Sequence, residues 1–285
     1  MMMRSDLRPA IGAHAMAMVI VLLWAHGGTY AKDGPIRSLS SGEKTAVLGS
    51  SIGLGIVAKL IPERHADSAE YTGYRANAFD RWWRTSIHGG NGYKSNFIDN
   101  SRGSLIAPAA GGIAIALVDI NRREFSRDIP LFVAGAVTTG AITNIGKRVF
   151  RRPRPYCHTD GVRPTGRSAT DSYHTESFFS GHASQAFFAA GFVNNRLRRH
   201  MRQEWRRDEY RSWRWASPLL TYGCATFVAG SRIQADKHHF TDVLTGAVVG
   251  YGISELFYRM CYEPGQTESG TTTGMPRMFS LAVTF

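Results

Sequence analysis

The sequence predicts an all-α fold, a helical bundle of about six core helices with an active site at one end. Several segments are apolar and rich in small residues, and their lengths favour helices over strands. None of them sustains the alternation of apolar and polar residues that marks a half-buried strand. With 43% hydrophobic and 20% charged residues, the chain has the composition of a globular protein, which excludes a wholly disordered one.

Six apolar segments define the expected core. In chain order they cover 45–61, 104–120, 129–145, 183–193, 217–230 and 243–257. Alanine, leucine, isoleucine and valine dominate them, and no internal repeat is visible, which favours a single bundle over an array of repeats. The connections are polar, and those at 62–102 and 194–216 also carry clusters of arginine and tryptophan.

The two ends of the chain lie outside this bundle, which we place at 43–260. Residues 1–31 have the order of a signal peptide, with Arg4 and Arg8 before an apolar stretch and a cleavage point after Ala31. An uncleaved N-terminal anchor is the alternative. The apolar stretch is, however, shorter than the about 20 residues that a membrane-spanning helix needs. Residues 264–285 begin as a flexible tail rich in Gly, Thr and Ser and end in an alternating pattern that fits one short strand.

The chain is strongly basic, with a formal net charge of +12 and a pI of about 10.0. Such a charge favours anionic partners: nucleic acid, anionic lipid or a phosphorylated substrate. The three cysteines show neither a CxxC spacing nor a zinc pattern, and no cluster of carboxylates suggests a metal ion.

Three cationic side chains are candidates for binding one anion. Lys147 and Arg154 follow the third apolar segment, and Arg232 follows the fifth. Arginine suits phosphate because its planar guanidinium donates two hydrogen bonds to two oxygens. Solvated helix ends are the alternative for such basic residues.

A second motif, Ser180-Gly181-His182, stands immediately before the fourth apolar segment. The backbone N–H groups of Ser180 and Gly181 would lie at the positive end of that helix, where phosphate oxygens bind. His182 could protonate a leaving oxygen.

The third motif combines a histidine with a carboxylate. His238 and Asp242 are four residues apart, so on a helix they share a face. A carboxylate beside a histidine fixes its tautomer, and His238 could then attack phosphorus. Such a pair is also common as a purely structural contact. The occurrence of all three motifs in order, each at the edge of an apolar segment, favours a catalytic site.

Together the three motifs resemble the signature of the type-2 phosphatidic acid phosphatase and vanadium haloperoxidase superfamily, and its bacterial acid or lipid phosphatases in particular. The resemblance rests on Lys147…Arg154-Pro155, Ser180-Gly181-His182 and Ser231-Arg232…His238…Asp242. One position departs from the family pattern, because Phe179 stands where the family usually has proline.

The resemblance implies a role for each residue. His238 would be the nucleophile, Asp242 its orienting partner and His182 the general acid. The phosphate would be bound by the residues Lys147, Arg154, Ser180, Gly181 and Arg232. No metal and no cofactor would be needed, and vanadate would inhibit by occupying the phosphate site.

The implied function is a metal-independent phosphatase that hydrolyses phosphate monoesters, lipid phosphates in particular, through a phosphohistidine. A periplasmic acid phosphatase acting on soluble esters is the alternative. A vanadium haloperoxidase and a non-catalytic basic binding protein rank below both. The expected partners are a phosphorylated lipid or small molecule and an anionic membrane surface, with no nucleic acid.

The location follows from the leader and from the basic connection at 194–216. Both place the active site outside the cytoplasm, at the periplasmic face, because arginine-rich loops stay inside. They conflict in one respect. Three membrane crossings after a cleaved leader would bring Lys147 to the inside. The sequence therefore leaves open whether the bundle is soluble, peripheral or integral to the membrane.

Overall fold

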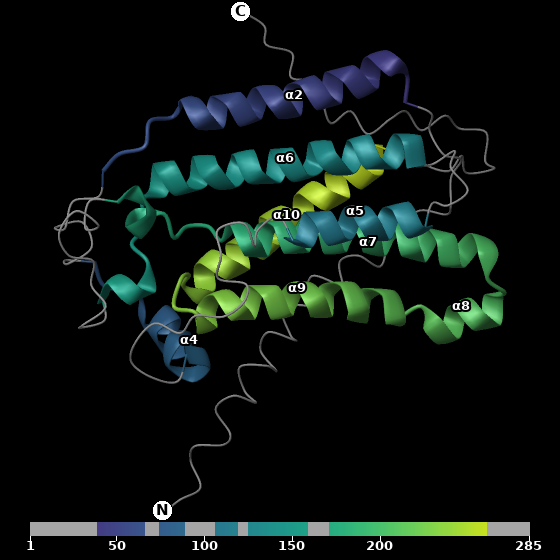
Figure 1. Cartoon of the computed structure of the whole chain (residues 1–285). Coiled ribbons are helices and arrows are strands. Elements are labelled where there is room, and N and C mark those ends of the chain that lie inside the picture. Colours follow the sequence, from purple (N-terminus) through teal and green to yellow (C-terminus); the bar gives the residue numbers. More distant parts are fainter. Residues whose placement is uncertain (1–38, 66–73, 89–105, 119–124, 159–170, 261–285) are drawn as a thin grey trace, which may run out of the picture.

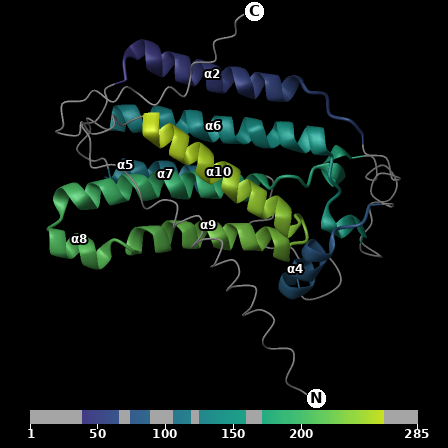
Figure 2. The same cartoon turned by 180° about the vertical axis from the view of Figure 1, so that it is seen from behind.

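The computed structural model describes residues 39–65, 74–88, 106–118, 125–158 and 171–260. The expected signal peptide or anchor at 1–31, the expected tail at 264–285 and Cys261 lie outside these residues. Within the described residues the regular structure is helical, without strands, which confirms the all-α prediction. Figures 1 and 2 show the helices from opposite sides.

Each of the six expected core segments corresponds to one helix. They are α2 (Ser41–Leu60), α5 (Ile106–Val118), α6 (Phe125–Phe150), α7 (Gly181–Glu204), α9 (Ala216–Gln234) and α10 (Phe240–Met260). Their N- and C-termini alternate along the bundle, so the end of α6, the start of α7, the end of α9 and the start of α10 meet at one end (Figure 1). We call this end the site end.

Helix α7 forms the centre of the bundle. It packs against α10, α9, α5 and α6, whereas α2 packs on the outside of α6. Every residue from His182 to Asn194 is buried. A helix that is buried on all sides needs small or apolar residues around its whole circumference, which explains the composition of the fourth apolar segment.

Helices α7 and α10 cross in direct backbone contact. A Cβ atom added to Gly250 would lie 2.0 Å from the carbonyl oxygen of Ser184, and one added to Gly246 would lie 2.6 Å from that of Ser180. No side chain fits at these two positions. The absence of side chains lets the start of α10 lie against the start of α7, where the Ser180 N–H donates to the Asp242 carbonyl at 3.0 Å.

The structure differs from the prediction in the polar connections. Helix α4 (Ala78–His88) lies at the site end, and α8 (Arg207–Trp213) lies at the opposite end (Figures 1 and 2). Helix α7 also runs 11 residues past the predicted end at Val193, to Glu204. Its basic last turns continue the helix because arginine is a good helix former, so charge alone did not mark the boundary.

Candidate active site

Lys147 lies in the last turn of α6, at the site end. The helix ends at Phe150, and Arg151 follows with a positive φ of 46°, which turns the chain away from the helix axis. A Cβ atom on Gly181 would be 3.9 Å from the Lys147 Nζ atom, so the ammonium group faces the N-terminus of α7. Phe179, the departure from the family pattern, is buried against Gly146 of the same helix end.

The Arg154 guanidinium is buried and held by backbone carbonyls. Its Nε, Nη1 and Nη2 atoms donate to the carbonyl oxygens of Tyr173, Lys237 and Glu176 at 2.7, 2.9 and 3.1 Å. Arginine has five N–H donors, so three bonds fix the group in place and leave two donors for an anion. The plane of the group also lies over the Tyr173 ring, with Cζ 3.8 Å from its centroid.

Ser180 begins helix α7 as its N-cap residue. Its hydroxyl accepts a hydrogen bond from the Ala183 N–H at 3.4 Å, and its own N–H donates to Asp242. The Ser180 N–H is therefore engaged inside the protein, contrary to the expectation that it faces a phosphate. The N–H groups of Gly181 and His182 follow in the first turn, where a helix supplies no partners of its own.

The third motif lies on the end of α9 and the start of α10. Arg232 is in the last turn of α9, and its carbonyl accepts from the Lys237 and His238 N–H groups at 3.1 and 3.3 Å. Asp236, at the tip of this turn, has a φ of 57° and is bound by the Arg84 guanidinium of α4 through two contacts of 2.6 Å. The turn that carries His238 is thus fixed from two sides.

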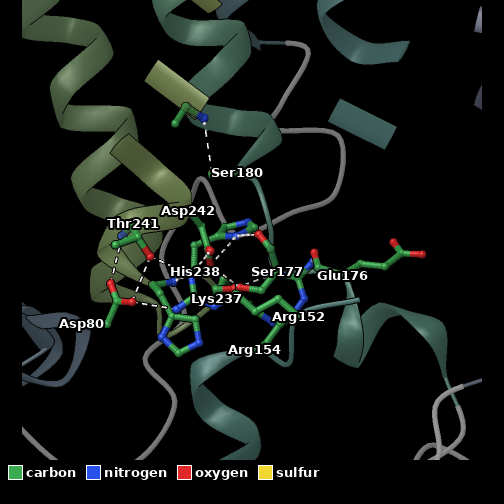
Figure 3. Close-up of polar contacts among 12 residues, drawn as sticks. Asp80, Arg152, Arg154, Glu176, Ser177, Ser180, Lys237, His238, Thr241 and Asp242 are labelled. Atoms are coloured by element: carbon green, nitrogen blue, oxygen red, sulfur yellow. Dashed lines mark hydrogen bonds and ion pairs between the residues drawn. The ribbon is translucent and has the colours of Figure 1, made fainter. Parts of the chain in front are cut away.

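The nearest partner of His238 Nδ1 is the carbonyl oxygen of Ser177, at 2.7 Å, while the Asp242 Oδ2 atom is 4.0 Å away (Figure 3). Asp242 instead accepts hydrogen bonds from the Ser177 hydroxyl at 2.5 Å and from the His239 N–H at 2.9 Å. The expected pairing of His238 with Asp242 is therefore indirect and runs through Ser177.

These contacts define the tautomer of His238. A carbonyl oxygen only accepts hydrogen bonds, so Nδ1 must carry the proton and Nε2 holds the lone pair in the neutral ring. Burial lowers the pKa of His238 well below its ordinary value, and the charges of Arg154, Arg232 and Lys147 lower it further. At neutral pH the imidazole is therefore uncharged, with the lone pair on Nε2.

The groups that lower the pKa of His238 are the predicted site residues, which therefore lie close to it in the structure. The groups that act on His238 are Arg154, Arg232, Lys147 and His182, which come from four separate segments of the chain. His182 is buried at the second residue of α7, and Arg232 is almost fully buried. In the described part of the chain, no three His, Cys, Asp or Glu side chains gather as they would around a metal ion.

Sequence reasoning did not identify Ser177, Arg152, Thr241 or Asp80, which also surround the site. Arg152 donates to Asp242 at 2.5 Å and to Asp80 at 2.7 Å, and Asp80 lies on α4 (Figure 3). Arg152 was visible only as one member of an arginine-rich run, and Asp80 only as an acidic residue in a polar connection.

Comparison of the sequence with known protein families finds a match that includes the predicted site residues. Residues 130–265 match the PAP2 superfamily. This part of the chain, just under half of its length, is similar to that superfamily. The match begins in α6, includes all three motifs and leaves out α2, α4 and α5. The predicted resemblance is confirmed.

Several curated PAP2 relatives are phosphatases that act on lipids by name. Diacylglycerol pyrophosphate phosphatase 1 of Saccharomyces cerevisiae is 33% identical over 85 residues, covering 30% of this chain and 29% of that protein. Phospholipid phosphatase 1 of Rattus norvegicus is 28% identical over 147 residues, covering 44% of this chain and 49% of that protein. The chain thus spans half the length of these relatives or less.

Among solved structures, the transmembrane PAP2-type phosphatidylglycerolphosphate phosphatase of Bacillus subtilis is 18% identical. The comparison covers 89% of this chain and 96% of that chain, with a TM-score of 0.41.

Proposed function

We propose that this protein is a metal-independent phosphatase that hydrolyses phosphate monoesters through a phosphohistidine on His238. The observation that carries the proposal is the Ser177 carbonyl on Nδ1, which leaves the Nε2 lone pair of a neutral histidine among three cations. A positioned neutral nucleophile beside an anion site is the arrangement that phosphoryl transfer requires.

The reaction has two steps. Nε2 of His238 forms a bond to phosphorus as the bond from phosphorus to the ester oxygen breaks, and that oxygen takes a proton from His182. Water then attacks the phosphohistidine and gives a proton to His182. The P–N bond breaks, its electron pair returns to Nε2, and inorganic phosphate leaves. Lys147, Arg154 and Arg232 stabilise the charge on the transferred group in both steps.

The first prediction concerns metals and vanadate. We expect activity to survive dialysis against EDTA, because the cations and the first turn of α7 supply the charge that a metal ion would otherwise supply. Orthovanadate should inhibit, since it adopts the five-coordinate geometry of phosphoryl transfer. Turnover of a phosphate ester, measured with and without each reagent, checks both expectations. Activity lost to EDTA and restored by a divalent cation would contradict the mechanism. Bromination by peroxide and vanadate would favour the haloperoxidase alternative.

We further propose that the substrate is a lipid phosphate. The names of the relatives support this class. Large apolar side chains are also exposed at the site end, namely Phe79 and Trp82 on α4 and Val149 and Phe150 at the end of α6. Lys147 lies one turn or less from the latter two, so acyl chains could contact them while the phosphate is bound. A panel of soluble and lipid phosphates, assayed side by side, separates this substrate class from the soluble-ester alternative.

The surface of the bundle supports membrane embedding. Large apolar side chains are exposed on the outer faces of the core helices. They are Ile52, Ile56, Val57 and Leu60 on α2, Ile106 and Ile113 on α5, Val133 and Val137 on α6, Leu219, Leu220 and Phe227 on α9, and Val248 and Leu256 on α10. Exposed apolar area this extensive is typical of a lipid-facing or partner-binding surface. Among the described helices, one segment, Asp128–Cys157, is long and apolar enough to cross a membrane by itself, which is weak evidence when taken alone.

We propose that the bundle spans the membrane with α8 at the cytoplasmic face and the site end outside. Exposed Trp205, Trp213 and Trp215, interleaved with arginines, lie around α8, as expected for a cytoplasmic interface. Helix α2 begins at the α8 end and ends at the site end (Figure 1). In this orientation the chain enters α2 from the cytoplasm.

The second prediction tests this orientation. Alkaline phosphatase fused after Pro155, or separately after Asp242, should be active, because both positions lie at the site end and the reporter works only outside the cytoplasm. A fusion after Arg207, in α8, should be inactive and serves as the matched control. Stable but inactive reporters at both site-end positions would place the site inside and overturn the proposed orientation.

A further inference from the structure

Helix α4 contacts the nucleophile-bearing turn although it lies outside the PAP2 match. Trp83 stacks on Phe240 at the start of α10, with ring centroids 4.2 Å apart and planes 10° from parallel. The Arg84 guanidinium binds Asp236, as described above. Asp80 lies in the first turn of α4, before Trp83 and Arg84, and its side chain is almost fully buried.

Both carboxylate oxygens of Asp80 are bound. The Oδ1 atom accepts from the Thr241 N–H at 2.9 Å, and Oδ2 accepts from the Thr241 hydroxyl at 2.9 Å and from Arg152 Nη2 at 2.7 Å. The side-chain amide of Asn77, which caps α4, donates the fourth hydrogen bond to the carboxylate, to Oδ2 at 2.8 Å. Burial alone would raise the pKa of Asp80, but the hydrogen bonds from Thr241 and Arg152 outweigh it and lower the pKa. The group is therefore a carboxylate at neutral pH.

Arg152 connects this carboxylate to the site. Its Nη1 atom donates to Asp242 Oδ1 at 2.5 Å and to the Thr241 hydroxyl at 2.6 Å, while Nε donates to the Tyr74 hydroxyl at 2.7 Å. The guanidinium is thus fixed in one orientation between two carboxylates, with one nitrogen for each. It has no second N–H in position for Asp242, because Nη2 is committed to Asp80.

From Asp242 the contacts continue to the nucleophile. Oδ2 accepts the Ser177 hydroxyl, and the Ser177 carbonyl binds Nδ1 of His238. The Ser177 N–H in turn donates to the Arg152 carbonyl at 2.9 Å. A displacement of Arg152 would therefore reach Ser177 by two routes, through the Asp242 carboxylate and through the backbone (Figure 3).

We propose that Asp80 is a positioning residue for phosphoryl transfer, which holds Arg152 so that Asp242 and Ser177 orient His238. The inference rests on the proposed function of His238. Without the Asp80 charge, Arg152 is drawn into a two-nitrogen pair with Asp242, since both of its terminal nitrogens can then bind one carboxylate. That pairing competes with the Ser177 hydroxyl for Asp242 and moves the carbonyl that fixes the His238 tautomer. Asp80 itself touches neither substrate nor the reacting atoms.

A double-mutant cycle separates this role from simple attachment of α4. We expect Asp80→Asn to lower kcat roughly 10- to 100-fold with KM changed less than about threefold, because misorientation of a nucleophile affects the reacting geometry more than binding. If Asp80 acts through Asp242, the double variant Asp80→Asn/Asp242→Asn should be no slower than Asp242→Asn alone, within about twofold. If the kcat losses of the two single variants multiply in the double variant, the proposal is wrong.

Arg84→Gln is the matched comparator, because it removes another contact of α4 with the same turn but none with Asp242. Its effect on kcat should multiply with that of Asp242→Asn, since the two changes act independently. Glu63→Gln, which removes an exposed ion pair with Arg148 at the site end, should leave kcat unchanged. Thermal unfolding confirms that each variant is folded. If Asp80→Asn does not fold, Arg152→Lys in the same cycle takes its place, and the same non-multiplying losses are required.

Orthovanadate affinity, measured by calorimetry in the same variants, gives a readout that does not depend on turnover. Weaker vanadate binding in Asp80→Asn, with no further loss in the double variant, supports positioning even if wild-type turnover proves independent of His238. If turnover does not depend on His238, the proposed function is wrong, but Asp80 is still shown to position the groups that bind the anion. The positioning role is rejected if Asp80→Asn binds vanadate as tightly as the wild type and if its kcat loss multiplies with that of Asp242→Asn.

Discussion

Replacement of His238 by alanine should lower kcat for any phosphate ester by at least about 10⁴-fold, with the protein still folded. The variant loses the Nε2 lone pair that attacks phosphorus in the proposed mechanism. The cations Lys147, Arg154 and Arg232 cannot take its place, because a protonated nitrogen has no lone pair to attack phosphorus. The cations remain, so phosphate binding should weaken far less than turnover.

Rapid acid and base quenching of wild-type enzyme with labelled substrate checks the chemistry directly. A phosphohistidine is labile in acid and stable in base, so label should remain on the wild-type protein only after the basic quench, and should be absent from His238→Ala. The neighbouring His239, whose ring nitrogen Nε2 contacts the Pro153 carbonyl at 3.1 Å, gives the control. His239→Gln should retain turnover within about tenfold. Near-normal activity in His238→Ala would remove the basis for the proposed function.

Replacement of His182 by asparagine should have the second largest effect, a loss of about 10²- to 10⁴-fold for an alkyl or lipid phosphate. An alkoxide is a poor leaving group and needs a proton, which His182 supplies in the proposed mechanism. p-Nitrophenolate leaves without protonation, so p-nitrophenyl phosphate should lose much less in the same variant. The comparison of the two substrates isolates proton donation from any general disturbance of the site.

The pH profile gives an independent check on the same variant. In the wild type, the acid limb of kcat/KM should reflect protonation of His238 and lie below pH 6.5, because burial and the adjacent cations lower its pKa from the ordinary value of 6.5. His182→Asn should keep an acid limb, because burial and the three cations lower the pKa of His238 without His182. Equal fractional losses for both substrates would exclude His182 as the general acid.

The core helices could be predicted because their segments are apolar over three or more turns, which is a strong signal in a single sequence. Helix α4 gave no such signal. Its 11 residues mix Arg, Trp and Asp, and it is stabilised by contacts with α9 and α10 rather than by its own composition. The far end of α7 was missed for the opposite reason, because a basic segment was taken as a connection although it continues a buried helix.

The candidate site could be predicted only where its residues have fixed spacing. Lys147, Arg154, His182, Arg232 and His238 belong to short motifs, and the structure brings them together. The direct partner of His238 could not be predicted, because it is a backbone carbonyl, and every residue has one. Asp80 contacts Thr241 across 161 positions of the sequence, a distance over which local spacing carries no information.

The glycine contact between α7 and α10 makes the separation of the two candidate catalytic histidines depend on residues that carry no functional group. Gly246 and Gly250 bring the start of α7, which carries His182, against the start of α10, which follows His238, by direct backbone contact. A single methyl group at Gly250 would need the space that the Ser184 carbonyl occupies and would push these two helices apart. The reaction geometry is therefore sensitive to an added carbon atom at a residue that takes no part in the chemistry.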